Sequence, residues 1–311
     1  MKRLTRYQSC LVLFASMGIH VGPLVHAADA TQAQERDDLA APLLAQADAP
    51  SDQALQAGIT FIRQGDIPAA IAAFEQAVEL APASAAAHYN LGLALRQDNQ
   101  IQAAATSFWQ ATQADPTFTL AYVNLGAALL EGNNLEQAQD YLNRALELEP
   151  ELGLAHYNTG LLQQRSGDST AALAAFDRAI AYSPTAPEPH YQAGLIYQGQ
   201  EQYDAAQAAF ESAIALDDSY LEARYNLGVT LVRRGELDSA VDQFARVIEL
   251  SPSFGHAYYA QAIALEDLQQ YEAAKAQLQL AIQTYVTQGN NQWANIAQQR
   301  LSRIELGNAE N

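Results

Sequence analysis

The chain has 311 residues, of which 35 are acidic and 16 basic, so its formal net charge is −19 and its isoelectric point is near 4.5. A surface this acidic repels phosphate groups, which argues against nucleic-acid binding and against direct binding to anionic lipids. Neutral and cationic partners remain compatible with this charge.

Residues 1–27 combine basic residues, a short apolar run and small residues before Ala27. The basic residues come first, the apolar run covers residues 10–19, and the helix-breaking pair Gly22-Pro23 comes after it. This order is typical of a secretory signal peptide, and we predict cleavage after Ala27 by the general secretory route. An uncleaved membrane anchor is the alternative, but the run is about half of the roughly 20 residues that a span needs. The protein is therefore expected to be extracytoplasmic: periplasmic or secreted, or in the thylakoid lumen if the source is photosynthetic.

Residues 28–50 are rich in Ala, Gln and Asp and show little apolar periodicity. This composition predicts a disordered or loosely helical acidic spacer. Removal of residues 1–27 would take away three of the 16 basic residues, which leaves 13 and a net charge of −22. It would also remove the single cysteine and both methionines, so the mature chain would hold neither a disulfide nor a thiol.

Seven units of 34 residues then follow one another without insertion or deletion. They cover residues 51–84, 85–118, 119–152, 153–186, 187–220, 221–254 and 255–288. The eighth place of each unit holds a small residue: Gly58, Gly92, Gly126, Gly160, Gly194, Gly228 and Ala262. The twentieth place is always alanine, and the twenty-fourth is large and apolar: Phe74, Phe108, Leu142, Phe176, Phe210, Phe244 and Leu278. Five units have a proline near their end, whereas Asp218 and Val286 replace it in the other two.

This register resembles that of tetratricopeptide repeats, and the resemblance covers residues 51–288. It implies that each unit is a helical hairpin, in which small residues let two helices approach and the large residue fills the space beside them. The expected fold is all-α: a right-handed α-solenoid of about seven hairpins. Residues 289–311 are predicted to form a capping helix and tail, with apolar positions at Trp293, Ile296, Leu301 and Ile304.

The resemblance also implies a concave groove lined by the first helix of each unit. The sixth places, which would face this groove, carry amides: Gln56, Asn90, Asn124, Asn158, Gln192 and Asn226. The fifth places carry tyrosines: Tyr89, Tyr157, Tyr191, Tyr225 and Tyr259. The twelfth or thirteenth places carry arginines: Arg63, Arg96, Arg165 and Arg233. These amides, tyrosines and arginines are the candidate peptide-binding residues.

A side-chain amide both donates and accepts hydrogen bonds, which suits capture of an extended peptide backbone. The alternative is that the amides satisfy neighbouring backbone groups, and the sequence leaves both roles open. A net hydrogen bond contributes about 0.5–1.5 kcal/mol, whereas micromolar binding needs roughly 8 kcal/mol. The tyrosines would therefore have to contribute to affinity. The family's basic clamp for a C-terminal carboxylate is absent, because no second, fifth or sixth place holds Lys or Arg.

Catalytic chemistry finds no support in the sequence. His88, His156 and His190 share the fourth place of their units, where packed helices would hold them about 10 Å apart, too far for a common metal ion. Neither a phosphate-binding loop nor a Gly-x-Ser-x-Gly motif occurs. We therefore predict a non-enzyme without catalytic residues, metal or cofactor.

The leading hypothesis is an extracytoplasmic scaffold that binds a partner protein or extended peptide in its groove and serves assembly or transport. The alternative is a structural subunit of an envelope complex that docks through its convex face or its terminal units. Trp109 stands at a twenty-fifth place otherwise filled mostly by polar residues, so it is a candidate for a convex contact. Homo-oligomerisation stays open.

Overall fold

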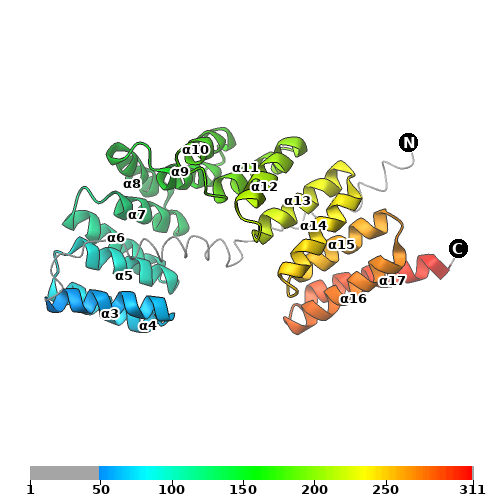
Figure 1. Cartoon of the computed structure of the whole chain (residues 1–311), viewed down its shortest axis with the longest axis horizontal. Coiled ribbons are helices and arrows are strands. Elements are labelled where there is room, and N and C mark those ends of the chain that lie inside the picture. Colours follow the sequence, from blue (N-terminus) through cyan, green and yellow to red (C-terminus); the bar gives the residue numbers. More distant parts are fainter. Residues whose placement is uncertain (1–48, 310–311) are drawn as a thin grey trace. The chain divides into compact units, whose positions relative to one another are not determined.

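The computed structural model describes residues 49–309, which contain 15 helices and no strand (Figure 1). The predicted signal peptide and nearly all of the predicted spacer lie outside the described residues. The described residues divide into two compact units, with the boundary between Leu148 and Glu149. The first contains α3 (Pro50–Gln64), α4 (Ile67–Leu80), α5 (Ala85–Gln97), α6 (Ile101–Ala114), α7 (Thr119–Glu131) and α8 (Leu135–Leu148).

The second unit contains α9 (Gly153–Arg165), α10 (Ser169–Tyr182), α11 (Glu188–Gly199), α12 (Tyr203–Leu216), α13 (Leu221–Arg234), α14 (Leu237–Leu250), α15 (Gly255–Asp267), α16 (Tyr271–Thr287) and α17 (Asn291–Ala309). Between residues 49 and 309, no helix is both long and apolar enough to cross a membrane. Each 34-residue repeat forms one hairpin, so the predicted all-α repeat fold is confirmed.

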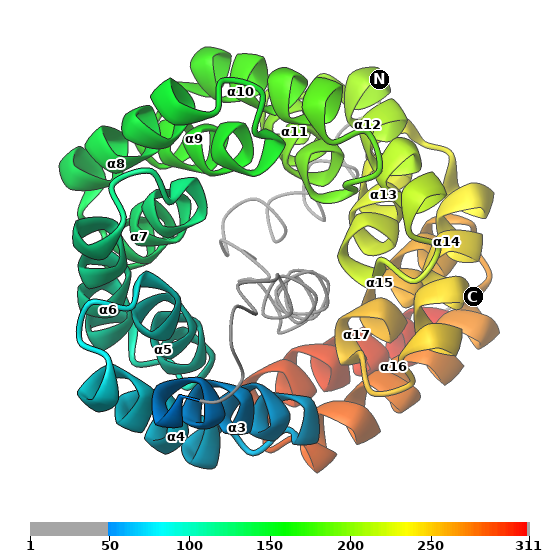
Figure 2. The ribbon, with the colours of Figure 1, turned by 60° about the vertical axis from the view of Figure 1, so that its left-hand side comes forward.

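Within each unit, the first helices of the hairpins lie side by side and the second helices pack behind them (Figure 2). The side formed by the first helices, turned away from the second helices, is called the first-helix face below. In the first unit it belongs to α3, α5 and α7, and in the second unit to α9, α11, α13 and α15. This face corresponds to the groove that the family resemblance predicted.

The turn inside every hairpin contains a residue with positive φ at the fifteenth place. Three of these residues are glycines, as in the "RQGD" turn of Gly65, where left-handed backbone carries no steric cost. The other four have side chains: Asn99, Asn133, Glu201 and Gln269. Aspartate caps some of the following helices, since Asp66 Oδ1 accepts a hydrogen bond from Ala69 N and Asp168 Oδ1 from Ala171 N. Turn geometry is therefore the same in all seven repeats although its residues differ.

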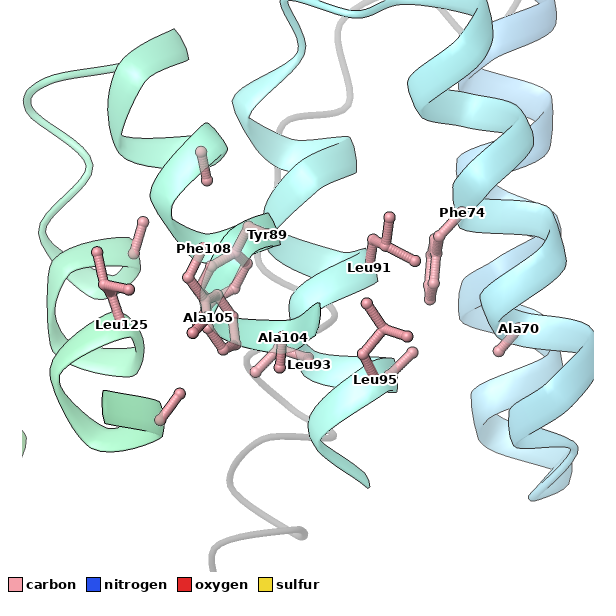
Figure 3. Packing of buried hydrophobic residues seen from close by; sticks show 14 of the residues in the cluster. Ala70, Phe74, Tyr89, Leu91, Leu93, Leu95, Ala104, Ala105, Phe108 and Leu125 are labelled. Carbon is pink, nitrogen blue, oxygen red and sulfur yellow. The ribbon is translucent and has the colours of Figure 1, made fainter. Parts of the chain in front are cut away.

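The small eighth-place residues are required by the close approach of the two helices. A Cβ atom built on Gly92 would lie 2.6 Å from the Phe108 ring, and one on Gly160 would lie 2.4 Å from the Phe176 ring. Both rings are fully buried. Figure 3 shows the first unit's core, where Phe74 and Phe108 pack with Tyr89 and the leucines of α5. The predicted pairing of a small and a large residue is thus confirmed.

The fourth-place histidines hold the turns between repeats. His88 Nε2 lies 2.9 Å from the Pro82 carbonyl oxygen, and His156 Nε2 lies 2.8 Å from that of Pro150. Because a carbonyl oxygen only accepts, Nε2 carries the proton in both rings. The predicted packing role of these two histidines is therefore supported. At the same place, Arg224 donates to the Asp218 carbonyl oxygen at 2.9 Å.

The last helix, α17, packs against α16 and brings an indole to the end of the stack. The Trp293 ring lies 4.7 Å from His256, 5.7 Å from Tyr259 and 5.9 Å from Tyr285. Leu301 and Ile304 are buried, whereas the exposed positions of α17 are mostly amides and arginine. Such a polar outer surface is what a terminal element of a repeat stack needs.

His256 should make the end of the second unit sensitive to acid. Tyr285 Oη lies 2.9 Å from His256 Nδ1, and burial lowers the pKa of His256. The neutral ring therefore contributes stability above the unfolded pKa near 6.5, and this contribution is lost as the pH falls through the lower folded pKa.

As the pH is lowered from 7 to 5, we expect the urea midpoint of the unaltered protein to decrease more than the urea midpoint of a His256→Phe variant. Trp293 fluorescence in a Trp109→Phe background follows this transition, because the chain has only two tryptophans. Burial raises the pKa of Glu188 and of Asp267, which acts in the opposite direction but is common to both proteins. Parallel pH profiles for the two proteins would contradict this role of His256.

Candidate functional site

The four predicted asparagines all lie on the first-helix faces and bond to their own helices. In each, Nδ2 donates to the carbonyl oxygen four residues earlier: 2.8 Å for Asn90, 3.2 Å for Asn124, 3.0 Å for Asn158 and 2.8 Å for Asn226. Two of them also reach the preceding repeat, because Asn124 Nδ2 lies 3.0 Å from Tyr89 Oη and Asn226 Nδ2 lies 3.4 Å from Tyr191 Oη. The amide nitrogen is thus engaged within the protein, and the carboxamide oxygen is the group that remains for a peptide N–H.

The predicted tyrosines pack against aromatic rings of their own repeats. Tyr89 packs against Phe108 and Phe118, with ring centroids 5.8 and 4.8 Å away. Tyr191 packs in the same way against Phe210 and Tyr220, at 5.9 and 5.1 Å. Tyr89, Tyr191, Tyr225 and Tyr259 are buried, whereas Tyr157 is half-buried. A partner could therefore reach Tyr157 directly, and would reach the others only at their edges.

The predicted arginines lie at the C-terminal ends of the first helices. Arg96 is paired with Glu131 of the next first helix, at a distance of 2.7 Å between Nη2 and Oε1. Arg165 is exposed and Arg233 is half-buried. Within the second unit, Arg165 and Arg233 thus lie at one edge of the first-helix face, while carboxylates lie at the opposite edge, at the N-terminal ends of α11 and α13.

The ninth-place residues of the first helices differ in exposure from one helix to the next. In the first unit the ninth-place residues Leu93 and Ala127 are 4% and 5% exposed. The corresponding residues of the second unit's first three hairpins are half-exposed: Leu161, Leu195 and Val229. Beside them, Gln192 and Asn226 are half-exposed as well. In the fourth hairpin the ninth-place residue Ile263 is 4% exposed. The α9, α11 and α13 part of the second unit's face therefore presents apolar surface bordered by amides.

The acidic edge of the second unit lies in apolar surroundings. Burial raises the pKa of Glu188, and the charge of Asp217 adds to this rise. Burial also raises the pKa of the Tyr191 hydroxyl, with a further contribution from the carboxylate of Glu222. A carboxylate in such surroundings is attracted to a cationic group more strongly than one in water.

Some residues of this face were not singled out from the sequence. Gln198 Nε2 donates to Thr230 Oγ1 at 2.9 Å and so joins α11 to α13. The apolar ninth places were also missed, although their recurrence at one place of the 34-residue register was a visible signal. Gln198 stands at the twelfth place, which Arg96 occupies in its own repeat, but its bond to Thr230 depends on the stacking of two hairpins.

Trp109 lies on α6, a second helix of the first unit, and is 41% exposed. The hydroxyl of Thr112 donates to the backbone carbonyl oxygen of Trp109, so the indole ring takes no part in this hydrogen bond. The ring is thus accessible on the side opposite to the first-helix face. Within residues 49–309 no group of three His, Cys, Asp or Glu side chains could hold a metal ion.

Comparison with known proteins finds one family and many related folds. The sequence profile described as "Tetratricopeptide repeat" matches residues 55–117, 123–187 and 191–253. Among solved structures, YrrB, described as a TPR protein with an unusual peptide-binding site, is 27% identical, with a TM-score of 0.52 over 63% of this chain and 99% of its own. No curated protein matches the sequence.

Two further structures show likeness of fold alone, at 18% identity. The Cut9–Hcn1 hetero-tetramer of the APC/C gives a TM-score of 0.64 over 82% of this chain and 51% of the matched chain. A tetratricopeptide repeat protein from Parabacteroides merdae gives 0.58 over 80% of this chain and 98% of its own.

Proposed function

The chain belongs to the tetratricopeptide repeat family, and from this premise we propose that it is a non-catalytic, extracytoplasmic scaffold that binds a partner protein or extended peptide on its first-helix face. The observation that carries the proposal is the open part of the second unit's first-helix face, over α9, α11 and α13, where Leu161, Leu195 and Val229 stay half-exposed. Half-exposed apolar side chains bordered by amides are typical of a surface that a peptide covers.

The chemistry of the face supports an extended peptide. Peptide N–H groups can donate to the half-exposed amides of Gln192 and Asn226, while apolar peptide side chains cover the ninth-place residues. Burial of this apolar surface supplies affinity that hydrogen bonds alone do not. Glu188 and Glu222 favour a cationic group of the partner at the N-terminal ends of α11 and α13. YrrB, which is described as having a peptide-binding site, is consistent with this use of the fold.

The extracytoplasmic part of the proposal comes from residues 1–27, whose pattern is typical of a signal peptide. An acidic mature chain without cysteine suits an oxidising compartment, because it has no thiol to oxidise. Cleavage after Ala27 can be checked by N-terminal sequencing of the protein recovered from its native compartment. An N-terminus at Met1 or Lys2 would contradict it.

Partner capture with two matched variants tests the binding face. Leu195→Glu places a charge in the half-exposed apolar surface, whereas Ala208→Glu places the same charge on the exposed side of α12. We expect the partner recovered from the native envelope to decrease at least tenfold with Leu195→Glu and to stay unchanged with Ala208→Glu, as quantified by mass spectrometry. Circular dichroism confirms that both variants are folded.

The alternative, docking of a structural subunit through its outer surface, is favoured by the exposed indole of Trp109. It predicts the reverse result: unchanged capture with Leu195→Glu and loss of capture with Trp109→Ala. The two proposals are thus separated by the same experiment.

A further inference from the structure

Three apolar side chains form a row across the first-helix face of the second unit. Leu161 of α9, Leu195 of α11 and Val229 of α13 hold the ninth place of consecutive repeats, and all three are half-exposed. They are called the apolar row below. The row ends at α15, where the ninth-place residue Ile263 is 4% exposed. Each of the three helices contributes one contact, so the distance between neighbouring helices sets the spacing of the row.

The helices α9, α11 and α13 are neighbours within the second unit (Figure 2). Leu161 of α9 packs against a buried cluster that includes Ile196 of α11. Gln198 Nε2 of α11 donates to Thr230 Oγ1 of α13 at 2.9 Å. Packed helices lie about 8–10 Å apart, so a peptide that crosses the three helices meets an apolar side chain about every 8–10 Å.

The repeat distance of a peptide backbone decides which conformation fits the apolar row. In a β-strand, the side chains on one face recur every two residues, about 6.6–6.8 Å apart. The strand residue above the middle helix would be about three residues from the first contact, and it would therefore point away from the face. In a polyproline II helix, three residues make one turn of about 9.3 Å, so every third side chain points to the same side. One turn thus matches one helix spacing.

The amides beside the apolar row distinguish a polyproline II segment from an α-helix. An α-helix also returns a side chain to one side after about 10.5 Å, or roughly seven residues, but its N–H groups bond within the helix. Gln192 and Asn226 lie half-exposed at the sixth place, next to the row. A polyproline II backbone has no internal hydrogen bonds, so its N–H groups are free to donate to carboxamide oxygens.

Carboxylates border the same surface at the second place of two repeats. Glu188 of α11 and Glu222 of α13 stand seven residues before the apolar row, on the same side of their helices. Burial raises the pKa of the Tyr220 hydroxyl, and it is raised further by neighbouring tyrosines and by the charges of Glu188 and Glu222. Both carboxylates are thus close to one buried tyrosine. A cationic side chain placed there is attracted by both charges.

On the basis of the proposed function, we propose that the second unit binds a polyproline II segment with an apolar residue at every third position and basic residues between them. The apolar residues cover the apolar row, and backbone N–H groups donate to the amides of the sixth place. The basic residues extend toward the carboxylates of the second place. Two turns span the distance from α9 to α13, so about seven peptide residues make the specific contacts.

Three labelled peptides test the spacing, with binding to the full chain measured by fluorescence anisotropy. The first repeats the triplet Leu-Lys-Pro, and the second has the same composition with its leucines at alternate positions. The third places leucines seven residues apart in an alanine-rich helix. We expect the triplet peptide to bind at least tenfold more tightly than the others, because each of them loses contacts with the apolar row or with the amides. Leu195→Glu should abolish this binding, whereas Ala208→Glu should leave it unchanged.

A second pair of variants tests the basic residues. Glu188→Gln should weaken binding of the Leu-Lys-Pro peptide about threefold, because it removes one of the two carboxylates. Glu211→Gln removes the same charge from an exposed position on α12 and should have no effect. Equal effects of the two variants would overturn the requirement for basic residues, since only the net charge of the protein would then matter.

Equal affinities of the triplet and alternate peptides would overturn the proposal, and so would tighter binding of the helical peptide. Absence of binding by every peptide would also overturn it, but the proposed function would survive if capture of the native partner still depended on Leu195. Capture of the native partner that does not depend on Leu195 would contradict the proposed function, and with it the class of peptide assigned to this face.

Discussion

Phe176→Ala is expected to destabilise the second unit by about 3–5 kcal/mol, as is usual when a fully buried aromatic ring is removed. The ring packs on Tyr157 at 6.0 Å and fills the space beside Gly160. Because each repeat is stabilised mainly by its neighbours, the loss should spread to the α11–α12 hairpin. Urea denaturation gives the size of the loss, and amide hydrogen exchange shows its extent along the chain.

The same site allows a sharper test with the opposite change in volume. Gly160→Ala adds a methyl group 2.4 Å from the Phe176 ring, which the fully buried ring cannot leave without strain. Overpacking costs about 1–3 kcal/mol, and it outweighs the gain of up to about 1 kcal/mol in helix propensity. We therefore expect a net loss of stability from Gly160→Ala.

Addition of Phe176→Leu should restore much of the stability that Gly160→Ala removes. The seventh repeat already contains this combination, because Ala262 stands with Leu278 and both are fully buried. The control is Phe176→Leu alone, which leaves a gap beside Gly160. If the effects of the two substitutions simply add, the close contact of these two places is not what fixes their residue types.

The hairpin core could be predicted because each partner is repeated at a constant spacing. Gly160 and Phe176 lie 16 residues apart in one hairpin, and the same spacing recurs in the other repeats. This periodicity is visible in the amino-acid sequence and indicates the contact directly. The turns were less visible: Glu201 and Gln269 adopt the same positive φ as Gly65, and neither residue type indicates a left-handed backbone.

The candidate site was predictable only in part, because exposure depends on which helices and turns pack against each side chain. The sequence placed Asn226 and Tyr191 on one face, and the structure does bring them together. It could not show that Tyr191 is held between Phe210 and Tyr220, which come from the second helix of its repeat and from the repeat's final turn. Whether the amides and tyrosines bind a peptide stays a prediction.

The C-terminal helix depends on a pairing that no local pattern revealed. Arg300 of α17 and Glu266 of α15 are 34 residues apart, and Arg300 Nε donates to Glu266 Oε2 at 2.7 Å. The Arg300 side chain is 3% exposed, while that of Glu266 is 23% exposed. The ion pair is therefore largely shielded from water at the arginine end, where a charge without its carboxylate is costly.

Glu266→Ala should accordingly destabilise the α15–α17 end by about 3 kcal/mol, because it leaves a guanidinium group in a buried position without this carboxylate. Arg300→Met should cost much less, since the flexible apolar chain fills the same space and Glu266 retains contact with water. Trp293 fluorescence during urea denaturation reports both losses in a Trp109→Phe background. The double variant Glu266→Ala with Arg300→Met should be more stable than Glu266→Ala alone.

That order of stabilities distinguishes two explanations of how Arg300 stabilises the protein: its ion pair with Glu266, or the space that its side chain fills. If Arg300 acted only by filling space, removal of Glu266 would be the milder change and Arg300→Met would not rescue it. If the buried charge is decisive, the second substitution recovers stability because it removes the guanidinium group that has lost the Glu266 carboxylate. The expected rescue also bears on binding, since Glu266 and His256 stand on α15, which packs beside α13 at the open part of the second unit's face. A loosened α17 should weaken partner capture without any change in Leu195.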